Sequence, residues 1–243
     1  MNTVFTLWLG QTNVLVRRCF RSWKKLGYHI IIYCDLTFHD SYIDQYELRD
    51  YRDVMNGNPK EILPFSDLWR YKRLYREGGI WLDADMYLLK RLPEDEIIIS
   101  SERCCQTGAY KRAFKSVPNI GVLKFPKEDP LLAMVIKKIE TSKSKSTKSV
   151  KNMQHFQKIL DKSFPEYYKY VADPSDYCPV NWSNCKEMYY GIEFKSKYGK
   201  EVQQIEEILD TSIGIHLWDN FTMNKFQIKF NKVKDGSLFS MLK

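Results

Sequence analysis

The stretch SDLWRYKRLYREGGIWLDAD, residues 66–85, decides the fold because it joins a helix, a sharp stop and a short buried strand. Ser66 is a candidate N-cap, and the spacing predicts a helix over residues 64–77 that ends at the glycines in positions 78–79. The apolar residues 80–82 predict a strand, which the sequence Asp-Ala-Asp breaks. A helix that leads directly into a buried strand is typical of α/β folds.

The amino-terminal residues show the same alternation. Residues 4–9 predict a first buried strand, and Asn13 is a candidate N-cap of a helix that ends at Gly27. Residues 29–34, HIIIYC, predict a second strand. Strand, helix and strand in this order form a βαβ unit, which favours a parallel sheet. The polar segment that follows predicts only a short helix near residues 42–51.

Later apolar runs continue the alternation to the end of the chain. They predict strands over residues 97–100 and 120–125, helices over 130–139 and 153–160, and a last apolar run over 213–218. We therefore expect an α/β protein with a mostly parallel sheet flanked by helices. Its length of 243 residues suits one domain over residues 1–243.

The net charge of +8, from 38 Lys+Arg and 30 Asp+Glu, suits a partner with negative charge. Nucleic acid, an anionic membrane surface and a nucleotide-sugar diphosphate all meet this condition. The basic stretch over residues 137–152 contains no aromatic residue that could stack on bases, and no zinc-finger, RNP or helix-turn-helix pattern is present. We expect no nucleic-acid partner, and a basic nucleic-acid-binding protein is kept as an alternative.

The sequence also bears on the cellular compartment. Its apolar runs are far shorter than the roughly 20 residues that span a bilayer, and its start has no basic region or cleavage site of a signal peptide. The six cysteines, which include the adjacent pair Cys104 and Cys105, show no C-x-x-C spacing. We expect a cytoplasmic protein with reduced thiols and no transmembrane segment.

Asp83 and Asp85 are the candidate metal ligands. Residues i and i+2 of an extended chain project to the same side, so the two carboxylates can share one hard cation such as Mg²⁺ or Mn²⁺. In the helix before them, Asp67 and Arg70 share a face and could reach one ligand. Open α/β sheets bind ligands at the carboxyl ends of their strands. Since a nucleoside diphosphate leaving group needs a divalent ion, the pattern indicates a metal-assisted diphosphate site.

Residues 66–85 resemble the sugar-binding D-x-D region of glycosyltransferase family 32 and also that of the large clostridial glucosylating toxins. The resemblance extends to TLWLG at residues 6–10, to Asn-Ile-Gly at 119–121 and to GIHLWDN at 214–220. It implies a Rossmann-like GT-A fold and a metal-dependent, retaining glycosyltransferase. A donor-binding part over about residues 1–125 and an acceptor-side part over about 126–243 are expected.

The resemblance also implies roles for residues on the donor side. Trp8 would stack on the nucleotide base. Asp67 and Arg70 would hydrogen-bond the donor sugar and the phosphate, and Asn119 would lie close to the transferred sugar. These roles make the nucleotide-sugar the expected cofactor-like ligand.

For the metal side, the resemblance implies that Asp83 lies near the ribose and the metal and that Asp85 is a direct metal ligand. His216 would supply a further metal or diphosphate contact, and Trp218 would touch the diphosphate. This chain has Asp-Asn-Phe at residues 219–221, where the family usually has Ser-Trp after the histidine. The resemblance therefore leaves open which residue of this segment contacts the metal.

Together these observations predict transfer of a hexose from a UDP- or GDP-linked donor to a glycan or other hydroxyl acceptor, with retention of anomeric configuration. No aspartate or glutamate stands out in the sequence as an inverting base. A second alternative is a domain that has lost activity and only binds nucleotide-sugars.

Overall fold

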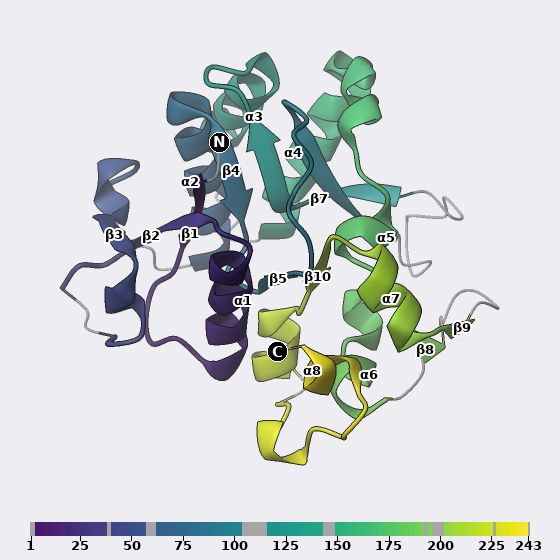
Figure 1. Cartoon of the computed structure of the whole chain (residues 1–243). Coiled ribbons are helices and arrows are strands. Elements are labelled where there is room, and N and C mark those ends of the chain that lie inside the picture. The colour runs from purple at the N-terminus through teal and green to yellow at the C-terminus, as the bar shows by residue number, and fades with distance from the viewer. Residues whose placement is uncertain are drawn as a thin grey trace.

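The computed structural model describes residues 3–37, 40–56, 62–103, 116–142, 149–191, 194–195, 202–225 and 227–242. Its centre is a six-stranded sheet in the order β3-β2-β1-β4-β7-β6 (Figure 1). The strands are β1 (Thr3–Leu7), β2 (His29–Cys34), β3 (Glu47–Asp50), β4 (Gly79–Leu82), β6 (Ile98–Arg103) and β7 (Ser116–Phe125). Strands β3, β2, β1 and β4 are parallel, and β7 runs antiparallel to both β4 and β6. The predicted α/β fold with a mostly parallel sheet flanked by helices is thus confirmed.

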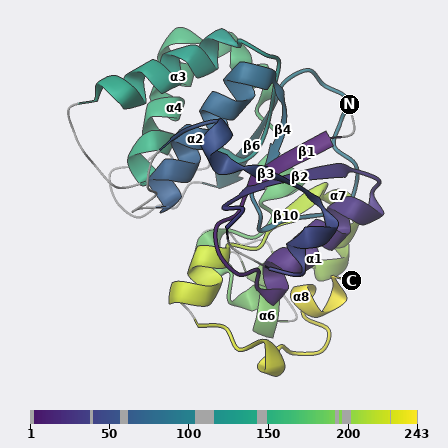
Figure 2. The same ribbon diagram turned by 90° about the vertical axis from the view of Figure 1, so that its left-hand side faces the viewer.

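Helices cover both faces of this sheet (Figure 2). Helices α2 (Ile62–Glu77), α3 (Pro130–Thr141) and α4 (Ser149–Ser163) lie on one face, and α1 (Val14–Lys25) lies on the other. Successive strand residues supply the two cores in turn: Val4 packs with α1, whereas Phe5 packs with α2. This alternation follows from the two-residue period of a strand and explains why β1, β2 and β4 carry apolar residues on both faces.

Helix α1 begins and ends as the sequence predicts. The Asn13 side chain accepts hydrogen bonds from the amides of Leu15 and Val16, each at 3.0 Å, and so caps the first turn. After the helix, Gly27 has φ +78°, a left-handed conformation that glycine adopts without strain. These two residues fix the length of the connection between β1 and β2.

Helix α2 begins earlier than its predicted start. It includes residues 62–77, so Ser66 lies within the helix and is not its N-cap. Pro64 is compatible with this start because the first-turn amides of a helix have no partner within the helix. The Ser66 hydroxyl instead accepts a hydrogen bond of 3.2 Å from Arg70 Nη2 one turn later.

The helix predicted near residues 42–51 is wrong. A short 3₁₀ turn over Ile43–Gln45 precedes β3, which adds to the edge of the sheet beside β2. The residues of β3 are all partly exposed, so the strand lacks the apolar run that marks β1 and β2. Its conformation is set by backbone pairing with β2, which local sequence patterns do not show.

A second, two-stranded sheet brings the carboxyl-terminal part of the chain back to the centre. Strand β5 (Met86–Leu88) pairs antiparallel with β10 (Gly214–His216), so that His216 lies opposite Met86. The described α-helices and further strands of this part are α5 (Pro174–Tyr177), α6 (Glu187–Tyr190), β8 (Phe194–Lys195), β9 (Val202–Gln203), α7 (Ile205–Thr211) and α8 (Leu238–Met241). The segment over residues 214–220 is therefore placed beside the D-x-D motif.

The structure also bears on membrane-spanning helices and on the cysteines. In the described ranges no helix combines the length and the apolarity that a membrane crossing requires. Cys19, Cys34, Cys178 and Cys185 are free and buried. The pair Cys104-Cys105 and residues 143–148 of the basic stretch lie outside the described residues.

Candidate functional site

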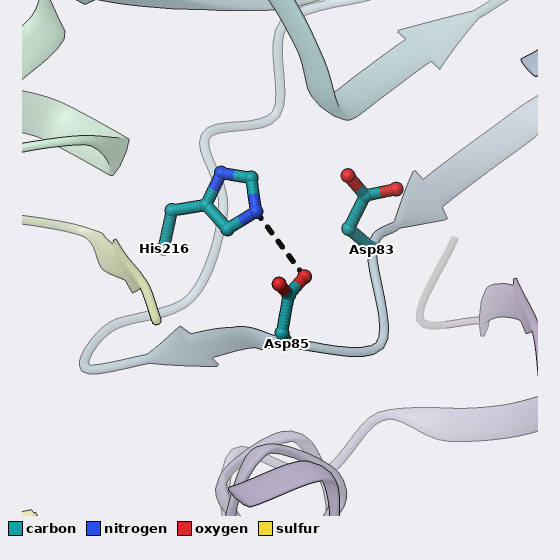
Figure 3. Close-up of side chains that lie close together, drawn as sticks. All are labelled: Asp83, Asp85 and His216. Carbon is teal, nitrogen blue, oxygen red and sulfur yellow. Dashed lines mark ion pairs between the residues drawn. The ribbon is translucent and has the colours of Figure 1, made fainter. Parts of the chain in front are cut away.

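The D-x-D motif lies where β4 leaves the main sheet and continues into β5. The amide of Asp83 donates to the carbonyl of Gly121 at 2.8 Å, which keeps Asp83 attached to β7, and the amide of Met86 donates to the carbonyl of Asp83 at 2.8 Å. The resulting turn presents Asp83 and Asp85 on the same side. Figure 3 shows both carboxylates facing the imidazole of His216, which comes from β10.

Asp83, Asp85 and His216 form a cluster that can hold a metal ion. One ligand atom of each residue lies within 4.8 Å of those of the other two. His216 Nε2 lies 3.2 Å from Asp85 Oδ1, and the second oxygen of Asp85 accepts the amide of Asp219 at 2.7 Å. Two carboxylates and one imidazole form a donor set that Mn²⁺ accepts, whereas Mg²⁺ prefers oxygen ligands alone.

A buried arginine adjoins this cluster. Arg70 Nη1 donates to Asp83 Oδ1 at 2.7 Å, and Arg70 Nη2 lies 3.3 Å from Asp67 Oδ1. The guanidinium also lies over the ring of Trp81 at 4.6 Å, and the indole N–H of Trp81 donates to Asp83 Oδ1 at 2.9 Å. Helix α2 and strand β4 thus fix the direction of Asp83 from two sides.

Burial and charge act together on the titration of these groups. Burial raises the pKa of Asp83 in spite of the charge on Arg70. Burial would raise the pKa of Asp85 as well, but His216 and the amide of Asp219 outweigh it and lower that pKa. For His216, burial lowers the pKa, and the charge and hydrogen bond of Asp85 raise it well above its usual value. Asp85 and His216 therefore each favour the charged form of the other.

Residues 119–121, Asn-Ile-Gly, form a bulge in β7. One residue separates Ile99 from Ser101 on β6, whereas four separate their partners Leu123 and Pro118 on β7. The extra residues turn their carbonyls towards the site: the carbonyl of Ile120 accepts Arg70 Nη1 at 2.7 Å, and that of Gly121 accepts the amide of Asp83. Bulges of this kind re-aim side chains next to functional sites.

The side chain of Asn119 is engaged at both ends. Its Oδ1 accepts the amide of Gly121 at 2.7 Å, and its Nδ2 donates to Glu102 Oε2 at 2.8 Å. Burial raises the pKa of the Glu102 carboxyl. The sequence analysis did not include Glu102, and it gave no role to Gly121 within the segment 119–121. Glu102 stands near the carboxyl end of β6, and ligands of α/β sheets bind at such ends. This position is the feature of the sequence that could have indicated Glu102 as a site residue.

Trp218 and Asp219 contact the cluster and connect it to neighbouring elements. The rings of His216 and Trp218 stack with centroids 3.9 Å apart, and Trp218 Nε1 donates to the carbonyl of Val180 at 2.8 Å. Asp219 Oδ1 accepts Asn13 Nδ2 at 2.7 Å, which ties the start of α1 to the site. Burial and the charge of Asp85 raise the pKa of Asp219 to about 6.

All eight residues singled out from the sequence line one cavity of about 570 Å³. They are Trp8, Asp67, Arg70, Asp83, Asp85, Asn119, His216 and Trp218. Among the described residues, the indole nitrogen of Trp8 is buried and has no hydrogen-bond partner. Glu102 and Trp182 also line the cavity. The cavity thus joins a cationic arginine, a metal-binding cluster and aromatic side chains, which together suit a ligand with a charged diphosphate and a ring system.

Part of the chain is similar to a known protein family. Residues 14–104 match the family model described as a glycosyltransferase sugar-binding region containing a DXD motif. No curated protein matches the chain. The match spans less than half of the chain and includes Asp67, Arg70, Asp83 and Asp85.

Several solved structures resemble the chain at low identity. They include the PaToxG glycosyltransferase, with 15% identity over 68% of this chain and 69% of that chain and a TM-score of 0.47. A structure described as a transferase has 11% identity over 71% and 90%, with a TM-score of 0.44. The apo form of the glycosyltransferase GlyE from Streptococcus pneumoniae TIGR4 has 16% identity over 71% and 45%, with a TM-score of 0.36. At these values the structural likenesses carry no weight for activity. From the family match, residues 14–104 are similar to the DXD-containing sugar-binding region of glycosyltransferases, and Asp83 and Asp85 stand within the matched residues.

Proposed function

We propose that the protein transfers a hexose from a UDP- or GDP-linked donor to a hydroxyl group of a glycan or other acceptor, with retention of anomeric configuration. The observation that carries this proposal is the convergence of Asp83, Asp85 and His216 next to the buried Arg70 in one cavity. The proposal includes a GT-A fold in which about residues 1–125 bind the donor. The segment with His216 and Trp218 completes this donor site from the carboxyl-terminal part.

The three residues of the cluster would hold Mn²⁺ or Mg²⁺. Their carboxylate oxygens and imidazole nitrogen lie close enough for one ion, and Asp83 uses only Oδ1 for Arg70 and Trp81. When bound, a divalent cation neutralises negative charge on a diphosphate leaving group. The mixed oxygen and nitrogen donor set favours Mn²⁺ over Mg²⁺.

The residues around the cluster would bind and orient the donor. Arg70 is kept cationic: burial lowers its pKa, but Asp83 and Asp67 outweigh burial and raise it. Its charge is therefore available to the diphosphate without proton exchange. Trp8 offers an aromatic surface for the nucleotide base. The stacked ring of Trp218 fixes the orientation of His216.

Retention follows if the acceptor approaches from the side that the diphosphate leaves. The bond from the anomeric carbon to the phosphate oxygen breaks, and a bond from that carbon to the acceptor oxygen forms. The acceptor proton passes to the departing phosphate oxygen, so no side chain has to act as a strong base. This route suits a site in which the aspartates at the centre are paired with Arg70 and His216.

The test is release of UDP or GDP from UDP- and GDP-hexoses with and without Mn²⁺, together with the anomeric configuration of the product. We expect Asp85→Ala to reduce metal-stimulated turnover by about a hundredfold or more, because lost charge stabilisation in an active site has effects of this size. The matched control is Asp95→Ala, which removes an exposed aspartate from the loop before β6. Full activity in Asp85→Ala or an inverted product would contradict the proposal.

A further inference from the structure

Glu102 is a half-buried carboxylate that lines the cavity and to which the mechanism above gives no role. Among the other carboxylates that line the cavity, Asp67 and Asp83 pair with Arg70 and Asp85 pairs with His216, whereas Asp219 accepts from the side-chain amide of Asn13 at the start of α1. Glu102 makes one hydrogen bond with the described residues, through Oε2 to the amide of Asn119, and no ion pair with them is seen.

An ionised carboxylate that is half-buried in the wall of a cavity and has one neutral partner can accept further hydrogen bonds from a ligand. The ligand that fills the cavity can supply them. A diphosphate cannot, because its oxygens are negatively charged and repel a carboxylate. The hydroxyl groups of a neutral sugar can, and hydrogen bonds from hydroxyl groups to a carboxylate are short and strong.

The position of Glu102 favours the donor sugar over the acceptor. Asn119, which holds Glu102, belongs to the bulge of β7 whose next two carbonyls bind Arg70 and the amide of Asp83. The sugar of a nucleotide-sugar is attached directly to the diphosphate, and the proposed function puts the diphosphate beside Arg70 and a cation held by Asp83, Asp85 and His216. Because Asn119 holds Glu102 at this bulge, we expect Glu102 to face the transferred sugar rather than the acceptor.

We propose that Glu102 binds hydroxyl groups of the transferred sugar and that Asn119 is a positioning residue that acts through it. The proposal rests on the proposed function. In the structure both ends of the Asn119 amide are already used, by Gly121 and by Glu102. Asn119 thus sets the direction of the Glu102 carboxylate, and Glu102 makes the contact with the sugar.

The experiment compares binding of the free nucleotide with binding of the nucleotide-sugar. Titration calorimetry with Mn²⁺ would use UDP, GDP, UDP-glucose and GDP-mannose as probes, with wild-type protein, Glu102→Gln and Glu102→Ala. Glu102→Gln keeps the size of the side chain and an oxygen that can accept from Asn119. The matched control is Glu94→Gln, which changes an exposed glutamate outside the cavity.

We expect both Glu102 variants to bind the free nucleotide as the wild type does and the nucleotide-sugar about tenfold more weakly or worse, as the loss of a hydrogen bond to a charged group predicts. Two results would overturn the inference. Unchanged binding of the nucleotide-sugar would show that Glu102 does not contact the sugar. Equal weakening of the binding of the free nucleotide would show that Glu102 only maintains the structure of the site. If the wild type binds none of the four probes, the proposed function itself fails.

Discussion

At the scale of single residues, Gly121 shows how tightly the candidate site is built. A Cβ atom at this position would lie 2.9 Å from Asn119 Oδ1, 3.3 Å from His216 Cε1 and 3.4 Å from Asp83 Oδ2. The φ angle of Gly121 is not positive, so the backbone conformation at this position also permits alanine. Glycine is therefore required here for space, because any side chain would press on the bulge and on two of the candidate metal ligands.

We predict that Gly121→Ala lowers donor turnover by about tenfold or more, since displacements of about 1 Å in an active site have effects of this size. The melting temperature should change little, because the clash falls on side chains that can shift into the cavity. Donor hydrolysis and thermal melting, measured on the same preparation, check both parts. Wild-type turnover in the variant would show that the space next to Asp83 and His216 is not needed.

Asp40 stabilises the connection that leads into α1. Its Oδ2 accepts both the amide and the hydroxyl of Thr12, at 2.6 and 2.7 Å, and its Oδ1 accepts the amide of Tyr42 at 2.9 Å. Burial alone would raise the pKa of Asp40, but these hydrogen bonds outweigh it and lower the pKa below its usual value. A carboxyl whose pKa is lower in the folded state stabilises the fold above its unfolded pKa.

We therefore predict that Asp40→Asn lowers the free energy of unfolding at pH 7 by about 1–3 kcal/mol. The difference from the wild type should shrink as the pH falls from about 4 through the lower pKa of the folded state, because the wild-type carboxyl then also becomes neutral. Urea unfolding between pH 7 and pH 3 measures this. A difference that stays constant over this range would show that the charge of Asp40 has no part in the stability.

At the scale of elements, the bulge in β7 is held in place from the neighbouring strand. The hydroxyl of Ser100 on β6 donates to the carbonyl of Asn119 at 3.2 Å and accepts the amide of Val122 at 2.9 Å. It thus replaces ladder hydrogen bonds that the extra residues of β7 interrupt. Because the bulge presents the carbonyls that hold Arg70 and Asp83, one serine links strand pairing to the geometry of the site.

We predict that Ser100→Ala costs about 1–3 kcal/mol of unfolding free energy, because it leaves a buried backbone amide without its partner. Donor turnover should fall as well, since the bulge loses its support. The control is Ser163→Ala at the exposed end of α4, which should change neither quantity. Chemical denaturation and the donor assay together test the link: lower stability with unchanged turnover would separate the bulge from the site.

The sequence predicted the elements whose own residues determine them. Strands β1, β2 and β4 and helix α1 have apolar runs, a cap or a stop glycine, and each lies within a few residues of its predicted place. Strands β3 and β5 were not predicted. Each is short and forms only because a distant strand supplies its backbone partners, β2 for β3 and β10 for β5. Pairing between distant strands leaves no local pattern in one sequence.

At the scale of the whole molecule, the candidate site also combines residues that one segment of sequence brings together with residues that only distant pairing brings there. Asp67, Arg70, Asp83 and Asp85 come from one continuous segment, so their spacing alone indicated a shared site. Glu102 reaches the cavity through the three-residue shift between β6 and β7, which no spacing in the sequence reveals. The resemblance pointed to the segment of His216, but its position beside Asp85 depends on the pairing of β10 with β5. The cluster therefore forms only when the carboxyl-terminal part folds back.

Because the cluster forms only in the completely folded chain, a ligand that binds there raises the stability of the whole fold. A ligand that binds only the folded state at about 100 times its dissociation constant adds about 2.7 kcal/mol of stability. For a chain of this size that corresponds to a rise of about 5–10 °C in melting temperature.

We predict such a rise when Mn²⁺ is added together with UDP or GDP, and a much smaller one with either nucleotide alone, because the diphosphate then lacks its counter-charge at Asp83, Asp85 and His216. In Asp85→Ala the added effect of Mn²⁺ should disappear, whereas Asp95→Ala should keep it. Equal shifts with and without Mn²⁺ in the wild type would mean that the nucleotide binds without a metal held by this cluster.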